Sequence, residues 1–220
     1  MDIKTILSAV AKAYKDFKKN FSTKKTTDEL FENFSASLKK SLGEYQTVYD
    51  YIWGKDTLNI DGVTKGYIPQ KGDTVIMDIS VGVDGVWCDV CRTFFVGEIS
   101  SAQRKCYELI KKTVRAGHSA LKAGVTAESV YRAVNLVYSE KEKNLVHHAG
   151  HQIGNEPLMQ PQFLEGRKEI IEDGKTYTIE SGLYEDFGIR LENNYLVNKE
   201  GAEDLFEDLL PLDIEEYILK

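Results

Sequence analysis

Residues 75–96, VIMDISVGVDGVWCDVCRTFFV, are the stretch that decides the expected fold. Two apolar runs with strand character flank the dipeptide Asp84-Gly85. An Asp-Gly pair between alternating apolar positions is a strong hairpin signal, because both residues accept a positive φ. We therefore predict a hairpin with a two-residue turn, in which Val83 faces Val86.

This register places two aspartates on one face of the hairpin. Asp89 lies opposite Ser80 and diagonal to Asp78, so the two carboxylates are neighbours at about 7 Å. Two like charges on one sheet face repel each other and lose solvation if they are buried. Folding alone does not favour this arrangement, whereas a cation bound between the carboxylates would stabilise it.

The composition of the chain indicates one globular domain, residues 1–220, with 42% hydrophobic and 29% charged residues. The formal net charge is -7, and no basic stripe is present, which excludes nucleic acid as the expected partner. Residues 1–21 carry charges every few positions, so we expect neither a signal peptide nor a membrane span. An odd number of cysteines, three, fits a reducing compartment, and we expect a cytoplasmic protein.

Cys88 and Cys91 form a CxxC motif, which raises the alternatives of a redox pair or a zinc site. Positions three apart on a strand face opposite sides of the sheet, which argues against both. No second cysteine pair exists to complete a zinc site. We predict that these two cysteines are packing residues.

Helices are expected before each of two strand regions. Apolar residues recur at helical spacing over residues 3–17, and Thr26 with Glu29 forms a capping-box pattern that opens a second helix. Ser100 with Gln103 repeats the capping-box pattern, and Thr126 opens a fourth helix. A strand region from 176 to 197 follows. The pattern predicts an α+β protein.

The same order of helix, helix and acidic strands occurs in both halves of the chain, residues 1–98 and 99–220. The matched pairs are Thr27 with Thr126, Asp78 with Glu180, and Asp89 with Glu192, at offsets of 99, 102 and 103 residues. Such offsets indicate a pseudo-two-fold architecture in which one acidic hairpin from each half meets the other. Chance similarity in a chain of helices and strands is the alternative.

The second hairpin is expected in ESGLYEDFGIRLENNYLV, residues 180–197. A three-residue loop over 186–188 would put Gly188 at the left-handed position that such loops require. Glu192 would then lie opposite Gly182 and diagonal to Glu180. Both glutamates share a face in this register, as the two aspartates do in the first hairpin.

Four carboxylates that converge from two hairpins require compensation by a metal or by several cations. His151, in HHAGHQIG, is the best candidate for one nitrogen ligand, because Gly150 and Gly154 allow a close approach of the backbone. This donor set suits two divalent ions, with Mn or Co first and Zn or Fe also compatible. Two such ions share and acidify a bridging water, so the expected chemistry is hydrolysis.

These residues resemble the five metal ligands of the pita-bread metallopeptidases, which include methionine aminopeptidase, aminopeptidase P, prolidase and creatinase. The motifs that carry the resemblance are Asp78 and Asp89 in VIMDISVGVDGVWCDVCRTFFVG, His151 in HHAGHQIG, Glu180 in YTIESGLY and Glu192 in IRLENNYLV. The resemblance covers nearly the whole chain and implies the pita-bread fold, with a central curved sheet. It implies that Asp78 holds one metal and that His151 and Glu180 hold the other. Asp89 and Glu192 would bridge both, and Glu180 would also be the general base for the bridging water.

Within the family, the sequence CRTF after Asp89 and the position of Arg190 before Glu192 look like the Xaa-Pro branch. The resemblance implies that His147 contacts substrate and that Arg190 steadies the carboxylates or a substrate oxyanion. It also implies a small peptide substrate, cleaved through a metal-bridging hydroxide, and a homodimer. His148 is expected on the other face of an extended segment, in a structural role.

The chain departs from the family pattern around the expected metal site. Asp61 stands where a histidine is usual, Leu158 replaces a second histidine, and Met159 and Ser181 replace a common Glu and Pro. The N-terminal domain usual in Xaa-Pro enzymes is also not expected. Asp61 and Leu158 are therefore candidate substrate-binding residues. A creatinase-like hydrolase of a non-peptide C–N bond and a non-catalytic binding module remain the alternatives to a peptidase.

Overall fold

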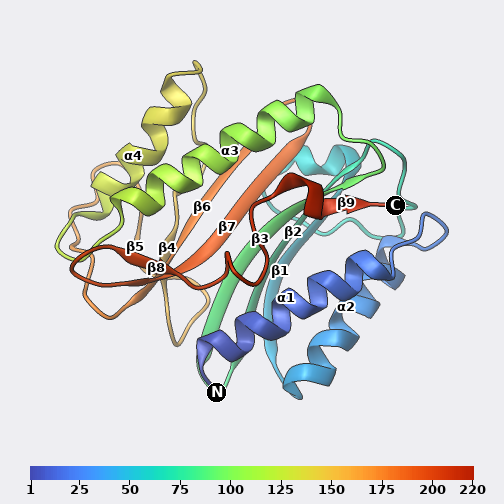
Figure 1. Cartoon of the computed structure of the whole chain (residues 1–220), viewed down its shortest axis with the longest axis horizontal. Coiled ribbons are helices and arrows are strands. Elements are labelled where there is room, and N and C mark those ends of the chain that lie inside the picture. The colour runs from blue at the N-terminus through green and yellow to red at the C-terminus, as the bar shows by residue number, and fades with distance from the viewer.

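The computed structural model describes residues 1–220, which form four α-helices and one nine-stranded sheet (Figure 1). The helices are α1 (Ile3–Lys19), α2 (Thr27–Leu42), α3 (Ser101–Ala120) and α4 (Ala127–Ser139). The strands are β1 (Gln46–Trp53), β2 (Thr74–Val83), β3 (Val86–Val96), β4 (His151–Ile153), β5 (Met159–Gln162), β6 (Thr176–Tyr184), β7 (Gly188–Val197), β8 (Ala202–Asp204) and β9 (Ile218–Leu219). Two short 3-10 turns cover Gly54–Leu58 and Ile214–Tyr217.

The two long hairpins lie side by side in the middle of the sheet. The strand order is β1-β2-β3-β7-β6-β4-β5, with β8 paired to β7 and β9 paired to β3. All pairs are antiparallel except β3 with β9. The predicted α+β class is confirmed, and β3 of the first hairpin is the neighbour of β7 from the second.

All four helices begin as the sequence predicts. The hydroxyls of Thr26 and Ser100 complete capping boxes at α2 and α3, and Thr126 caps α4. Each hydroxyl satisfies a backbone N–H group that the first helical turn leaves without a partner. None of the helices is long and apolar enough to cross a membrane.

The helices cover one face of the sheet and leave the other face for the acidic residues. α1 packs against β2 and β3, while α3 packs against β6 and β7 (Figure 1). Val75, Met77 and Ile79 of β2 face the main core. Because side chains alternate along a strand, Asp78 and Ser80 point to the opposite face.

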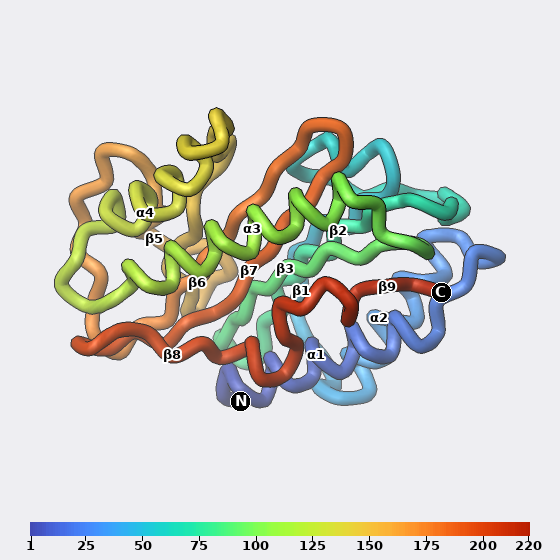
Figure 2. Tube along the Cα trace, turned by 45° about the horizontal axis from the view of Figure 1, so that its top comes forward, coloured from blue at the N-terminus to red at the C-terminus, as the bar shows by residue number.

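The C-terminal segment, residues 202–219, lies between the two helix pairs (Figure 2). Arg92, fully buried in β3, holds it by donating to Leu210 O at 2.7 Å and to Tyr217 Oη at 2.9 Å. The same guanidinium donates to Glu192 O on β7 at 2.8 Å. One buried cation thus links both central strands to the end of the chain, through neutral acceptors that satisfy its donors.

The first hairpin has the predicted register. Val83 faces Val86, Asp89 faces Ser80, and Asp84 and Gly85 both have positive φ. The two cysteines of the CxxC motif lie on opposite sides of the sheet, with Cys88 in the main core. This agrees with the predicted packing role.

The second hairpin has a different register from the predicted one. Its loop is residues 185–187, Tyr184 pairs with Gly188, and Glu180 lies directly opposite Glu192. Gly188 is therefore a strand residue without positive φ. A Cβ at this position would lie 1.9 Å from Thr57 O, so glycine is required by a close approach rather than by the turn. The loop still has three residues, and the prediction that both glutamates share a face is confirmed.

We expect Gly188→Ala to destabilise the protein, because the added methyl group collides with the backbone of Thr57. Overpacking of this kind costs roughly 1–3 kcal/mol, and each kcal/mol lowers Tm by about 2–4 °C in a chain of this size. Thermal unfolding followed by circular dichroism measures the change. The control is Gly201→Ala, where a Cβ meets nothing within 4 Å. Equal Tm values for the two variants would contradict the close-approach explanation.

Candidate metal centre and active site

A cavity of about 530 Å³ lies on the sheet face opposite the helices. Every candidate site residue from the sequence lines it: Asp61, Asp78, Asp89, His147, His151, Leu158, Glu180, Arg190 and Glu192. It is also lined by Asp50 and His148, for which the sequence indicated no such place. Carboxylates, imidazoles and one guanidinium therefore share a single pocket.

The carboxylates are placed by strand register. Asp78 and Asp89 stand on the β2–β3 hairpin, and Glu180 faces Glu192 across the β6–β7 hairpin. The two hairpins join where Cys91 of β3 pairs with Glu192 of β7. Opposed residues on neighbouring strands lie about 4.5–5.5 Å apart, so this one junction brings the four side chains together.

Polar side chains hold the junction where regular strand pairing is sparse. The amide of Asn194 accepts from Asp89 N at 3.1 Å and donates to Asp89 O. The hydroxyl of Thr93 donates to Arg190 O at 2.8 Å and accepts from Arg190 N at 2.9 Å. These contacts fix the spacing between the two hairpins, and therefore between their acidic residues.

His151 presents one ring nitrogen to two carboxylates. Its Nδ1 lies 2.9 Å from Gln152 O, and a carbonyl can only accept, so Nδ1 carries the proton. Nε2 lies 3.6 Å from Asp89 Oδ2 and 3.8 Å from Glu192 Oε1. Burial lowers the pKa of His151, but Asp89 outweighs this effect and the pKa is raised. A proton or a cation is therefore favoured at Nε2.

Gly150 allows His151 to reach this position. Its φ of +131° and the 2.2 Å between an added Cβ and Thr178 O exclude other residues. The chain then enters β4, where the backbone N–H of His151 donates to the Thr178 hydroxyl at 3.1 Å.

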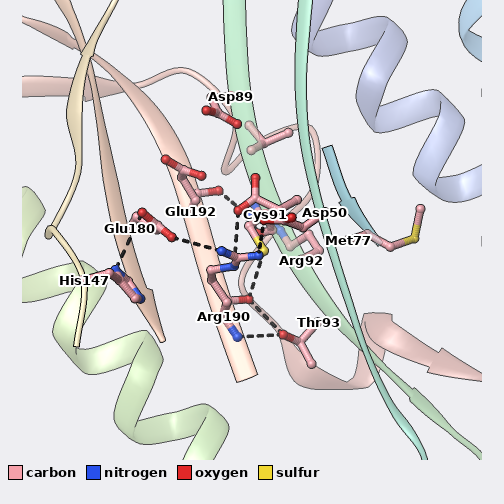
Figure 3. A network of polar contacts seen from close by, with 12 residues as sticks. Asp50, Met77, Asp89, Cys91, Arg92, Thr93, His147, Glu180, Arg190 and Glu192 are labelled. Atoms are coloured by element: carbon pink, nitrogen blue, oxygen red, sulfur yellow. Dashed lines mark hydrogen bonds and ion pairs between the residues drawn. The ribbon is translucent and has the colours of Figure 1, made fainter. Parts of the chain in front are cut away.

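Arg190 is the one guanidinium in the cavity, and its side chain is 3% exposed. Measured between nitrogen and carboxylate oxygen, it lies 3.2 Å from Asp78. It also lies 2.9 Å from Asp50 and 3.5 Å from Glu180, which are both labelled in Figure 3. Because Asp50 lies opposite Asp78 in the β1–β2 register, these two carboxylates face a common cation.

Burial has opposite outcomes for different carboxyls of the cavity. It raises the pKa of Asp78 and of Glu192 well above the usual value. Arg190 lowers the pKa of Asp78, whereas the nearby carboxylate of Asp89 raises both pKa values further. The pKa of Glu180 is lowered, because His147, His148 and Arg190 together outweigh its burial. Glu180 is thus held as the anion, whereas Asp78 and Glu192 retain protons more readily.

The structure corrects the expectation for His148. Its Nδ1 lies 3.3 Å from Glu180 Oε2, beside His147, whose Nδ1 is 3.8 Å from the same oxygen (Figure 3 shows His147). The alternation of an extended strand does not apply, because residues 143–150 have no regular structure. Tyr184 Oη lies 3.3 Å from His147 Nε2, which completes a polar cluster around Glu180.

The donor atoms fit divalent ions. Asp89, His151 and Glu192 form one group whose donor atoms lie within 4.8 Å of each other, and His147, His148 and Glu180 form another. Asp89 Oδ1 and Glu192 Oε1 are buried without any hydrogen-bond partner. Such atoms are costly unless a ligand satisfies them. This grouping differs from the assignment implied by resemblance, in which Asp78 holds one metal, and that assignment stays a prediction.

Asp61 and Leu158 lie on the wall of the cavity, and both are exposed. Neither side chain makes a hydrogen bond, an ion pair or a core contact that would explain its identity. Their roles in substrate binding stay predictions.

Comparisons with known proteins agree with this geometry. The model of metallopeptidase family M24 matches residues 2–199. The chain belongs to this family. An uncharacterised peptidase of Methanocaldococcus jannaschii is 29% identical over 200 residues, which is 81% of this chain and 56% of that protein. A Xaa-Pro dipeptidase of Pyrococcus furiosus is 28% identical over 66% of this chain and 42% of its own length.

Solved structures confirm the pita-bread fold of this M24 chain. An X-Pro aminopeptidase of Thermotoga maritima superposes with a TM-score of 0.90 at 21% identity, over 98% of this chain and 62% of that one. A prolidase of Pyrococcus horikoshii has a TM-score of 0.87 at 22% identity, over 93% of this chain and 60% of that one. This M24 chain thus spans between 42% and 62% of the length of these four proteins.

We expect Glu192→Gln to stabilise the metal-free M24 domain while it removes metal binding. The substitution replaces a buried carboxyl with raised pKa by a neutral group of the same shape. Because the folded protein binds the proton of Glu192 more tightly than the unfolded chain does, Glu192 contributes to stability at low pH. This contribution is lost as the pH rises through the pKa that Glu192 has in the folded protein. The gain in Tm should therefore be larger at about pH 8 than at about pH 5.

Thermal melts of metal-free protein at both pH values test this prediction, with the exposed Glu32→Gln as control. An equal effect of the two substitutions on Tm would contradict it.

We also expect metal binding to release protons, because Asp78 and Glu192 have raised pKa values in the metal-free protein. Metal affinity should rise from about pH 6 to about pH 8. Titration calorimetry in two buffers of different ionisation enthalpy counts the released protons. Affinity that is independent of pH would show that these carboxyls are already ionised or are not ligands.

Proposed function

We propose that this chain is a dinuclear metal-dependent hydrolase that cleaves small peptides of the Xaa-Pro type. The observation that carries the proposal is the pair of carboxylate-histidine groups in one cavity of an M24 chain. The Xaa-Pro dipeptidase of Pyrococcus furiosus and the X-Pro aminopeptidase of Thermotoga maritima support the substrate class.

The five residues that would hold the metals are Asp78, Asp89, His151, Glu180 and Glu192. Two divalent ions there would acidify a shared water and polarise the scissile carbonyl. Mn or Co is the proposed metal, as the donor set of oxygens and one nitrogen favours hard or borderline ions. A homodimer and a cytoplasmic location remain part of the proposal.

Three cavity residues have further roles that follow from their contacts. Glu180, held as the anion, accepts a proton from the attacking water. His147 lies beside Glu180 and Tyr184; its Nδ1 donates to His148 O at 2.7 Å, so its Nε2 can accept from an N–H group of the substrate. Arg190 keeps Asp78 and Glu180 oriented through its planar guanidinium.

A second candidate function, a creatinase-like hydrolase of a non-peptide C–N bond, is favoured by Asp61. This residue places an exposed carboxylate on the cavity wall, where it would attract a substrate that carries a guanidinium or ammonium group. Leu158 offers an apolar contact on the same wall.

We expect metal-free protein reloaded with Mn or Co to hydrolyse an Xaa-Pro dipeptide, and Asp89→Asn to lower kcat/KM by roughly 100-fold or more, because the substitution removes a proposed metal ligand. The assay pairs an Xaa-Pro dipeptide with its Xaa-Ala counterpart and includes a panel of small guanidino compounds. Asp208→Asn is the control, since the side chain of Asp208 is exposed and makes no hydrogen bond or ion pair.

Turnover of the guanidino compounds alone would favour the second candidate. Absence of bound metal and of all turnover after reloading would leave a non-catalytic binding module.

A further inference from the structure

Asp50 occupies a position that is unfavourable unless it has a specific partner. It lies on β1 directly opposite Asp78 of β2, and both residues line the cavity. Like charges in directly opposed positions on neighbouring strands destabilise a sheet. Arg190 lies against both carboxylates and provides the compensating charge.

The guanidinium of Arg190 divides its three nitrogens among three carboxylates. One terminal nitrogen donates to Asp50 Oδ2 at 2.9 Å, whereas Nε lies 3.2 Å from Asp78 and the other terminal nitrogen 3.5 Å from Glu180 (Figure 3). The contact with Asp50 is the shortest of the three. Asp50 is also the one carboxylate of the three that is outside the proposed ligand set.

The second oxygen of Asp50 holds the cavity wall. Oδ1 accepts from Gly62 N at 2.8 Å, and Tyr51 N donates to Gly62 O at 2.9 Å. Gly62 directly follows Asp61, which lines the cavity. One carboxylate thus joins the segment that carries Asp61 to the guanidinium that contacts Asp78 and Glu180.

We propose that Asp50 is a positioning residue, which holds Arg190 on the β1 side of the cavity so that Asp78 and Glu180 stay available to divalent cations. Through Gly62 it also fixes the Asp61 wall relative to these two carboxylates. The inference rests on the proposed function, because it concerns the same metal centre.

Loss of the negative charge at Asp50 has a defined consequence. Arg190 remains buried and cationic, since Asp78 and Glu180 face it. Without its one side-chain hydrogen bond, the guanidinium turns toward these two carboxylates and competes with the metal for them. A charged donor left unsatisfied in a buried site is costly, which drives this movement.

The test compares Asp50→Asn, which keeps the shape and removes the charge, with Asp50→Glu, which keeps the charge and changes the length. Titration calorimetry of metal-free protein with Mn²⁺ or Co²⁺ measures affinity. We expect Asp50→Asn to weaken binding by roughly tenfold or more, as for other residues that orient metal ligands. Asp50→Glu should retain tighter binding than Asp50→Asn, and Asp208→Asn should match the wild type.

Two further measurements separate positioning from a merely structural role. Arg190→Lys lacks the planar fork, so adding Asp50→Asn in that background should weaken metal binding by less than about twofold. In the reloaded enzyme, KM for a dipeptide should rise in Asp50→Ala beyond the change in kcat, because this substitution also removes the oxygen that accepts from Gly62 N and holds the Asp61 wall.

The outcomes also separate this inference from the proposed function. Wild-type protein that takes up no metal overturns both. Wild-type protein that binds metal while Asp50→Asn binds it equally well overturns the inference alone. Should Asp50→Asn unfold, Asp50→Gln and Asp50→Glu provide a pair of equal length that differs in charge, and equal metal affinity in that pair would overturn the inference.

Discussion

Burial of several carboxylates on one sheet face is the constraint on which the rest of the structure depends. Asp78, Glu180 and Glu192 are each held in a largely desolvated pocket, with Arg190 as the one guanidinium among them. Such a cluster is unfavourable in itself, and the charge of one arginine does not balance it. The apolar core on the helix-covered face supplies the stability that allows this arrangement. Protonation of Asp78 and Glu192 lowers this cost, and divalent cations bound at the same face would offset it.

The junction between the two hairpins determines how far apart the buried carboxylates lie. β3 and β7 share only the register pair Cys91–Glu192, and the flanking contacts come from Asn194 and Thr93. On the helix-covered face, Arg92 of β3 donates to Glu192 O of β7 and to Leu210 O of the C-terminal segment. The acidic residues are therefore supported from both sides of the sheet.

Structural features that depend on neighbouring residues were predicted correctly, whereas features that depend on residues far apart in the chain were misplaced or missed. The Asp84-Gly85 turn determines its register within a few residues, and capping boxes determine helix starts, so both predictions are confirmed. Gly188 was misplaced because the reason for glycine there is Thr57, 131 residues away in the chain. Asp50 was missed for the same reason, since its partner Arg190 is 140 residues away. No local pattern carries information about such contacts.

The parts of the cavity differ in how strongly the fold constrains them. The acidic residues sit on paired strands, where a shift of one residue would turn every side chain to the other face. Asp61 and Leu158 lie in segments without such pairing, so substitutions there leave the strand register unchanged. Changes at these two positions can therefore alter the cavity wall without moving the acidic residues. Asp50 is the exception, because its two oxygens join a variable wall to the fixed centre. A change of conformation at Asp61 would therefore be transmitted through Asp50 and Arg190 to Asp78 and Glu180.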